Sequence, residues 1–409
     1  MKNCELYLDR EEVKIKFKKL TVLLTALGIL FSVMPNIRIL DINLTISDVL
    51  FILVFILQLI SSKFTLYLPF KKTVVIFWVL GIYLMIIGFM LSSINTNYII
   101  NSTLVSLQYF FTFVFLPIIL IRFNKKSLII FLKTYIFGLV FVTFSGILTY
   151  FEINIFFENY IIVTGNQRLA SFLGNPNILG SLLASAIPLT FYMYFKKYLN
   201  GFVITLVIPL FIAGIALTSS FGSIFILLIT CVGFFILMFN IKAVSRVIFF
   251  MLPGFIAYYY LFGFPEILEK RVLSINNISD AGSLDSRLQL NSLAWEKISE
   301  ITFLGYGENF LLGITNVTNV HNVFLSIWLS GGYLSIIGFL ITLVVLASFS
   351  IKNWINNKKM DGAIAITQVL AVILSAFSTT HLYSRFWLIP TFLVLFLLKK
   401  DNDEKSKLK

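Results

Sequence analysis

The sequence predicts an all-α protein that crosses a membrane many times, and three observations support this. Of the 409 residues, 58% are apolar and only 12% are charged, against about a quarter charged in soluble domains. The apolar residues gather in runs of about 17 to 25, the length of a membrane-spanning helix. Only two cysteines, Cys4 and Cys231, are present, so a disulfide-stapled secreted scaffold is excluded.

Twelve apolar runs are candidate transmembrane helices within one membrane domain, 1–409. They lie at about 20–34, 46–60, 73–92, 103–121, 127–150, 177–195, 201–218, 221–239, 244–262, 322–350, 362–380 and 383–398. Because a backbone in lipid must satisfy its own hydrogen bonds, we expect each run to be helical. The first run has no small-residue cleavage site after it, so we expect an uncleaved anchor. The connections are short except for one long external loop, 263–320.

The basic residues predict the orientation. With a cytoplasmic amino terminus, the inner segments hold 25 basic and 8 acidic residues, a net charge of +17. The outer segments hold 7 basic and 11 acidic residues, a net charge of −4. This asymmetry follows the positive-inside rule and predicts a membrane protein with both termini in the cytoplasm. The overall charge of +13 is then a topology signal, and we expect no nucleic-acid partner.

Ionisable side chains are nearly absent from the predicted spans. Lys133 lies near the inner end of its span and can extend its amine to the surface, and we expect no intramembrane Asp, Glu or His. Proton-coupled transport usually requires such groups at mid-membrane depth. The pattern therefore disfavours a transporter.

The first candidate binding segment is 165–177, which leads into the sixth span. Asn175 followed by Pro176 is typical of a helix start, because Asn caps free amide groups and Pro fits the first helical position. The partial positive charge of that helix end, together with Arg168, Asn175 and Asn177, suits a phosphate. The alternative is that Asn175 only caps the helix and that Arg168 is a surface charge.

The second candidate lies in the long loop, where 283–298 predicts an amphipathic helix capped by Ser283. Its expected apolar face, which rests on the membrane surface or on the bundle, comprises Leu284, Leu288, Trp295 and Ile298. Arg287 lies in the first turn, where a cation gains nothing from the helix dipole. We therefore consider it a substrate-binding cation, the alternative being an arginine beside a lipid headgroup.

The two histidines of the chain, His321 and His381, fall in predicted outer segments. His321 and Asn322 open the tenth span, and His321 shares a helical face with Phe324, Leu325 and Trp328. Asn322 is a candidate substrate-binding residue. A half-buried imidazole there is a candidate proton acceptor; the alternative is a helix-end residue without a catalytic role. His381 precedes Arg385 in a short turn, and nothing around it indicates a base.

Other chemistries lack their motifs. The chain has no serine in a nucleophile elbow, no paired metal ligands and no glycine loop for a nucleotide. We therefore expect neither a metal nor an organic cofactor.

These segments, in this order, resemble the O-antigen ligase and Wzy-type polysaccharide polymerase superfamily. The matching pieces are the 168–177 run, the Ser-Arg-Leu around Arg287 with Trp295 behind it, Gly305-Tyr306-Gly307, and His321-Asn322 followed by Gly331-Gly332-Tyr333. The resemblance is strongest over 165–345.

The resemblance implies a metal-independent glycosyltransferase that acts on undecaprenyl-pyrophosphate-linked glycans at the outer face of the bacterial cytoplasmic membrane. Family arginines bind the pyrophosphate and a histidine lies near the acceptor hydroxyl, roles that transfer to Arg287 and His321. The family often has Ser-Arg-Gly where this chain has Ser220-Phe221-Gly222, so Arg168 or Arg385 is the candidate second cation.

The expected activity is polymerisation of lipid-linked repeat units for a capsule, exopolysaccharide or O-antigen. The alternative within the family is a ligase that moves finished glycan to a lipid or protein acceptor. A flippase of lipid-linked oligosaccharides is a third alternative. Expected partners are the lipid-linked glycans, membrane lipids, a chain-length regulator and a flippase.

Overall fold

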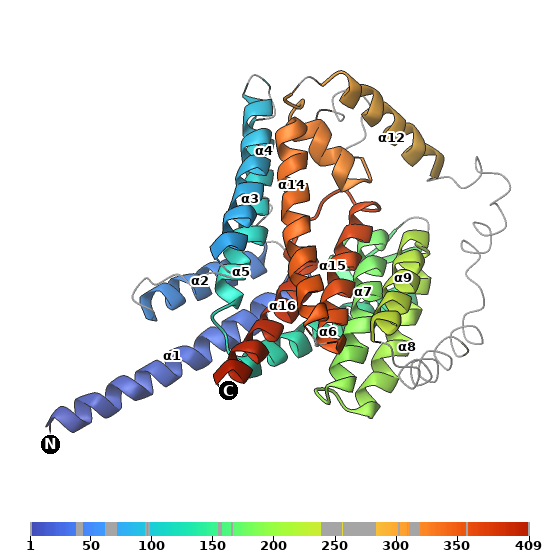
Figure 1. Cartoon of the computed structure of the whole chain (residues 1–409). Coiled ribbons are helices and arrows are strands. Elements are labelled where there is room, and N and C mark those ends of the chain that lie inside the picture. Colours follow the sequence, from blue (N-terminus) through green and yellow to red (C-terminus); the bar gives the residue numbers. More distant parts are fainter. Residues whose placement is uncertain are drawn as a thin grey trace.

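The computed structural model describes residues 2–37, 44–61, 72–94, 96, 99–153, 158–164, 167–238, 256, 284–301, 303–308, 310, 320–356 and 359–407. Within these ranges the chain is mostly helical, which agrees with the predicted all-α class. The start of α1 and the end of α16 lie at one end of the bundle, and α12 lies at the opposite end (Figure 1). We refer to this opposite end as the α12 end.

The helices follow the predicted runs closely. Their bounds are α1 Lys2–Ser32, α2 Ile46–Ser61, α3 Lys72–Ser93, α4 Ile99–Phe110, α5 Leu116–Leu120, α6 Lys125–Tyr150, α7 Pro176–Phe195, α8 Gly201–Thr218, α9 Phe221–Met238, α12 Leu284–Ser299, α14 Val323–Ile355, α15 Lys359–Ala376 and α16 Arg385–Lys407. A π-helix, Phe111–Phe115, joins α4 to α5, and a 3₁₀ turn occupies Glu158–Tyr160.

Among the described residues, eight helical segments are long and apolar enough to cross a membrane. They are α3, α4 continued through α5, α6, α7, α8, α9, α14 and α15, and each corresponds to a predicted span. The predicted 46–60 span is α2, a shorter apolar helix, whereas 20–34 and 383–398 fall within α1 and α16. The predicted 244–262 span lies outside the described residues except for one position. The membrane protein is thus multi-pass, with eight candidate spans among the described residues, and the count of twelve stays a prediction.

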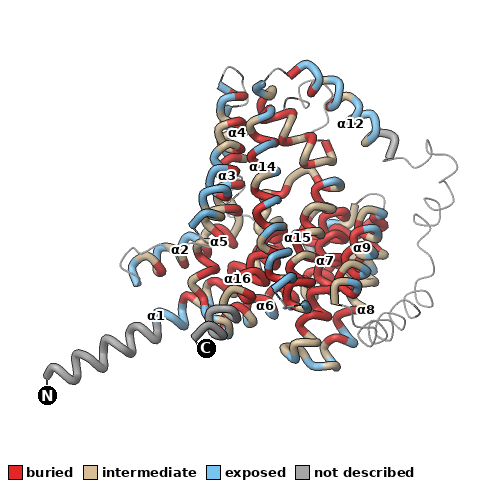
Figure 2. Tube along the Cα trace, in the orientation of Figure 1, coloured by how far each residue is buried: buried red, intermediate tan, exposed pale blue. Residues whose placement is uncertain are grey.

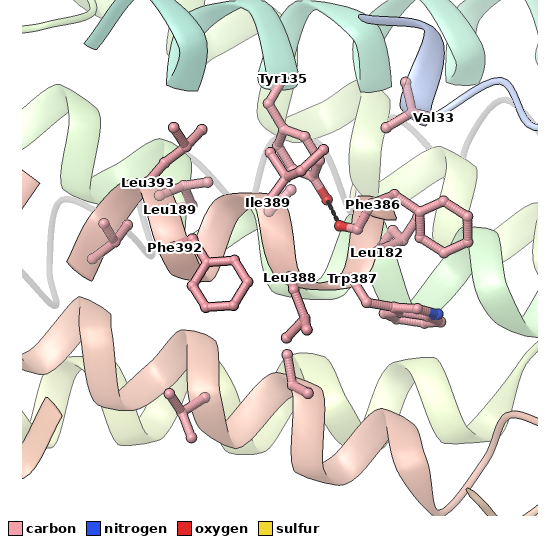
Figure 3. Close-up of a cluster of buried hydrophobic side chains, with 14 of the residues drawn as sticks. Val33, Tyr135, Leu182, Leu189, Phe386, Trp387, Leu388, Ile389, Phe392 and Leu393 are labelled. Carbon is pink, nitrogen blue, oxygen red and sulfur yellow. Dashed lines mark hydrogen bonds between the residues drawn. The ribbon is translucent and has the colours of Figure 1, made fainter. Parts of the chain in front are cut away.

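The centre of the bundle is formed by α7 and by the first half of α16, which are buried on all sides (Figure 2). A helix that is apolar around its whole circumference is stable only when other helices enclose it. Between them, Tyr135 of α6 donates its hydroxyl to the carbonyl oxygen of Phe386 at 3.1 Å. Figure 3 shows this bond among the apolar side chains around it, which include Leu182 of α7 and Phe392 of α16.

Small residues let α3 and α14 approach closely, as is common for helices packed in membranes. A Cβ atom on Gly81 would lie 2.8 Å from the carbonyl oxygen of Gly338, and one on Gly338 would lie 2.3 Å from that of Gly81. Ser335 adds a hydrogen bond from its hydroxyl to the carbonyl oxygen of Met85, at 2.7 Å. Only glycine fits at the two crossing positions.

Helix α14 is broken near its start, at Gly332, whose φ of 68° and ψ of −162° are not helical. The break separates a short arm, 323–331, from a long arm that continues to Ile355. Segment 303–308 of the long loop docks at the break. The amide of Tyr306 donates to the carbonyl of Leu329 at 2.9 Å, and the amide of Gly307 donates to that of Ser330 at 2.9 Å.

The amide that follows the break also binds segment 303–308: Tyr333 donates to the carbonyl of Phe303 at 3.1 Å instead of to a carbonyl of its own helix. Two glycines permit this contact: a Cβ atom on Gly305 would lie 2.4 Å from the oxygen of Leu329, and one on Gly332 would lie 2.4 Å from that of Phe303. Two motifs that are separately weak in the sequence, 305–307 and 331–332, therefore form one structural unit.

A short antiparallel hairpin, which the sequence analysis did not predict, precedes α7. Strands β1 Ile162–Thr164 and β2 Arg168–Ser171 pair in the register Ile162↔Ser171, Val163↔Leu169 and Thr164↔Arg168. All four residues of β2 are buried, and the strand packs against α6, α7 and α8. The strand thus carries Arg168 into the protein, although an external charge was one expectation for it.

The docked break predicts that Gly332→Ala destabilises the protein by about 1–3 kcal/mol or more, because non-glycine residues are strained at this backbone conformation and the methyl group meets the Phe303 carbonyl. Thermal unfolding of the detergent-solubilised protein measures the effect. Gly233→Ala is the matched control, since its new methyl group would meet only one atom, at 3.9 Å. Equal melting temperatures for the two variants would contradict the proposed role of the break.

Candidate active site

His321 lies just before the short arm of α14, next to Asn322, which caps the helix. The Asn322 side-chain oxygen accepts from the amide of Phe324 at 3.0 Å and from that of Leu325 at 3.3 Å. This is the N-cap expected of an asparagine at a helix start, and it satisfies two otherwise unpaired donors. The side-chain oxygen of Asn322 is therefore used to cap its own helix. The imidazole of His321, next to the helix N-terminus, is half-buried.

Helix α12 packs beside the short arm of α14 (Figure 1). Ala294 and Ile298 are buried in a small apolar cluster with Leu325 and Leu329 of the short arm. Trp295 contacts Trp328 edge to face, with ring centroids 5.8 Å apart. The amphipathic helix is therefore confirmed, with its predicted cap outside the described residues.

Only part of the predicted apolar face of α12 packs against the short arm. Ile298 is buried, whereas Leu288 and Trp295 stay 51% and 53% exposed, and the prediction that this face rests on the membrane surface remains a prediction. The buried contacts come instead from Ala294, a small residue that lets the helix approach the short arm. A helical wheel ranks residues by hydrophobicity and does not show which turn of the helix meets a neighbour.

This packing brings Arg287 close enough to His321 for its charge to act on the imidazole. Burial, the larger cause, and the positive charge of Arg287 both lower the pKa of His321 from its usual value. The imidazole is therefore neutral at pH 7. A neutral imidazole beside a guanidinium can take a proton while the cation binds an anion.

Arg168 lies at the start of α7, as the sequence predicts, but within the protein. Its Nε donates to the carbonyl oxygen of Thr218 at 2.8 Å, and its terminal nitrogen donates to the Asn177 side-chain oxygen at 3.0 Å. Asn175 caps α7 by accepting from the amide of Asn177 at 2.9 Å, with Pro176 in the first turn. The guanidinium thus joins β2 to the end of α8 and the start of α7.

Arg168 also lies on the turn in which the family resemblance expects an arginine. Thr218 ends α8, Ser219 has a left-handed backbone with a φ of 47°, and Phe221 begins α9 with its side chain 42% exposed. The guanidinium of Arg168, from β2, is therefore bound to the Thr218–Phe221 turn, which has no arginine of its own. The positive charge at this turn comes from a different element of the chain.

Arg385, the third candidate cation, forms an ion pair with Asp48 in the first turn of α2. Their Nε and Oδ1 atoms are 2.6 Å apart, and Asp48 also accepts two hydrogen bonds from Thr45 at 3.0 Å. The guanidinium carbon lies 4.8 Å from the ring centre of Phe111 in the π-helix. The expectation that the predicted spans contain no Asp, Glu or His does not hold for Asp48, which is buried at the start of the predicted 46–60 span.

The candidate residues therefore form three groups: His321 with Arg287 and Asn322, Arg168 with Asn175 and Asn177, and Arg385 with Asp48. Of these three groups, only the first combines a neutral base with a cation.

Glu308 is a further candidate that the sequence analysis did not single out. Its amide donates to the hydroxyl of Ser102 at 3.1 Å, and its half-buried carboxyl bonds to Ser330 at the break of α14. Burial raises the pKa of the Glu308 carboxyl to about 7, although the Ser330 hydrogen bond acts in the opposite direction. The only signal in the sequence is a carboxylate directly after the Gly-Tyr-Gly turn.

The second histidine, His381, contacts an aromatic ring and a hydroxyl group. Its ring stacks on that of Tyr383 with centroids 4.3 Å apart, and its Nδ1 lies 2.9 Å from the hydroxyl oxygen of Thr380. Burial lowers the pKa of His381 to about 4. Across the described ranges, no three His, Cys, Asp or Glu side chains gather into a group that could hold a metal ion.

The proximity of Arg287 and His321 predicts that Arg287→Gln raises the pKa of His321, because one of the two causes that lower it is removed. Histidine-selective isotope labelling and an NMR pH titration measure this directly, since the chain has two histidines. The His381 signal, with its pKa near 4, is the internal control and should not move. An unchanged His321 pKa in the variant would show that the two side chains do not interact.

In a comparison with protein families, residues 205–343 match the family model described as O-Antigen ligase. The matched segment contains Arg287, Glu308 and His321, together with both glycine motifs of the α14 break; it ends within the long arm of α14. Arg168 and Arg385 lie outside it. No curated protein matches the chain.

Proposed function

Because residues 205–343 are an O-antigen ligase family segment, we propose that this multi-pass membrane protein polymerises undecaprenyl-pyrophosphate-linked oligosaccharide repeat units. The observation that carries the proposal is the pairing of a neutral histidine with an arginine inside that segment. Members of this family are glycosyltransferase-like enzymes. The +17 and −4 split of charge supports an α12 end that faces outward from the cytoplasmic membrane.

The proposed reaction forms one glycosidic bond and breaks one bond to phosphate. An acceptor hydroxyl oxygen attacks C1 of the donor sugar, its proton passes to the neutral ring of His321, and the C1–O bond to the pyrophosphate breaks. The electron pair of that bond stays with the undecaprenyl pyrophosphate. Arg287 stabilises the negative charge that grows on this leaving group. Because the donor is already activated, the reaction needs no nucleotide.

The second cation of the proposal is Arg168. Its guanidinium is held at the Thr218–Phe221 turn, where family arginines stand, whereas Arg385 is neutralised by Asp48. An arginine with two fixed hydrogen bonds is also already oriented, so little rotamer entropy is lost when an anion approaches. Arg385 is then a positioning residue that fastens α16 to α2.

We expect His321→Ala and Arg287→Ala each to reduce chain extension at least about 100-fold, the scale of a lost general base or charge-stabilising group. The assay is a gel ladder from the reconstituted protein supplied with the lipid-linked repeat units of its host. Lys297→Ala is the matched control, because Lys297 is on the same helix as Arg287 and its ion pair with Glu300 is exposed. Full-length polymer from either site variant would refute the assignment.

The same assay separates the related activities. A ladder from lipid-linked repeats alone supports a polymerase. Transfer that occurs only after addition of a separate lipid or protein acceptor would identify a ligase. In a deletion strain, repeats retained on the inner leaflet would identify a flippase instead.

A further inference from the structure

The carboxyl group of Glu308 is not needed to dock its own segment. Segment 303–308 is fastened by backbone groups: the amides of Tyr306 and Gly307 bond to carbonyls of α14, and that of Gly305 bonds to the Ser92 hydroxyl at 2.8 Å. Glu308 contributes its amide to the same set through Ser102. The side chain is therefore placed by the docking without being required for it.

A carboxylate has about four acceptor positions, and the Ser330 hydroxyl occupies one of them. Within the described part of the chain, no ion pair to Glu308 is present. Glu300 provides a contrast in the same loop, since it is exposed and bonds to both Lys297 and the hydroxyl of Tyr306. A half-buried carboxylate with unfilled acceptor positions is costly unless a ligand supplies donors.

The surroundings of Glu308 are rich in hydroxyl groups and aromatic rings. Its charge acts on Tyr109 of α4, whose ring meets that of Tyr383 edge to face at 5.5 Å. Tyr383 in turn stacks on His381, and both rings are half-buried. Hydrogen-bond acceptors beside a partly exposed ring surface suit a ligand with many hydroxyl groups on a compact apolar frame.

The position relative to His321 also fits. Ser330, which holds the carboxyl, is the second-last residue of the short arm of α14, and His321 lies two residues before the arm begins. Nine residues of helix span about 13 Å. Glu308 is thus bound to one end of the short arm of α14, and the proposed base, His321, lies at the other end.

We infer that Glu308 forms a saccharide-binding subsite, in which its carboxylate accepts hydrogen bonds from sugar hydroxyls and holds the glycan in register with His321. The inference rests on the proposed function for the identity of the glycan, but it concerns binding and not bond formation. Glu308 is accordingly a substrate-binding residue and His321 remains the proton acceptor. The raised pKa of Glu308 is consistent with a carboxyl that lacks a cationic partner in the free protein.

The test is binding of the free repeat-unit oligosaccharide, released by mild acid from the lipid-linked donor of the host, to the full-length protein in lipid nanodiscs. Glu308→Gln keeps the shape and removes the charge, so we expect at least a tenfold weaker Kd, because hydrogen bonds to charged groups are the stronger ones. Glu308→Asp keeps the charge on a shorter side chain and should lie between the two. Glu300→Gln is the control and should bind as the unchanged protein does.

Thermal unfolding of the same samples shows whether Glu308→Gln is folded. Wild-type Kd in folded Glu308→Gln, or no binding by the unchanged protein, would overturn the subsite. Polymerisation can be scored separately on the gel ladder. Glu308-dependent binding without any polymer supports the subsite and contradicts the polymerase, whereas normal ladders with Glu308-independent binding contradict the subsite alone.

Discussion

The carbonyl groups of Leu329 and Ser330 lose their helical donors where α14 breaks at Gly332, and a backbone in an apolar bundle cannot leave them unpaired. The amides of Tyr306 and Gly307 replace those donors at 2.9 Å each. Much of the proposed site depends on this exchange. It fastens the end of the long loop to the helix, positions Glu308, and sets the direction of the short arm, on which α12 packs.

Buried arginines in the bundle, like its buried backbone groups, require hydrogen-bonding or charged partners. Arg385 is neutralised by Asp48, and Arg168 is divided between the Thr218 carbonyl and the Asn177 amide. Breaking such contacts leaves a buried charge, which is far more costly than the contacts are worth by themselves. The charge of Arg287 also acts on the imidazole of His321. In the proposed function, the His321 group provides the base and one cation, and Arg168 provides the second cation.

Much of the fold follows from composition and periodicity. Long apolar runs predict helices because lipid allows few alternatives, and the helices α3 to α9, α14 and α15 lie where the runs predict them. The asparagine caps at Asn175 and Asn322 are equally local, since a cap involves only the next three residues. The β1–β2 hairpin was missed because seven strand residues give almost no periodic signal. The ion pair of Asp48 was missed because its partner lies 337 positions later in the chain.

The sequence by itself determined the membrane class, most helices, the helix cap at Asn175 and the family resemblance through Arg287 and His321. These depend on hydrophobic runs and on residues close in the chain. Only the tertiary structure decided that Arg168 points inward to the Thr218 turn, that Ala294 rather than Leu288 packs α12 onto the short arm, and that Glu308 lies at the break of α14. Each of those placements depends on which segments distant in the chain meet, and local pattern carries no information about that.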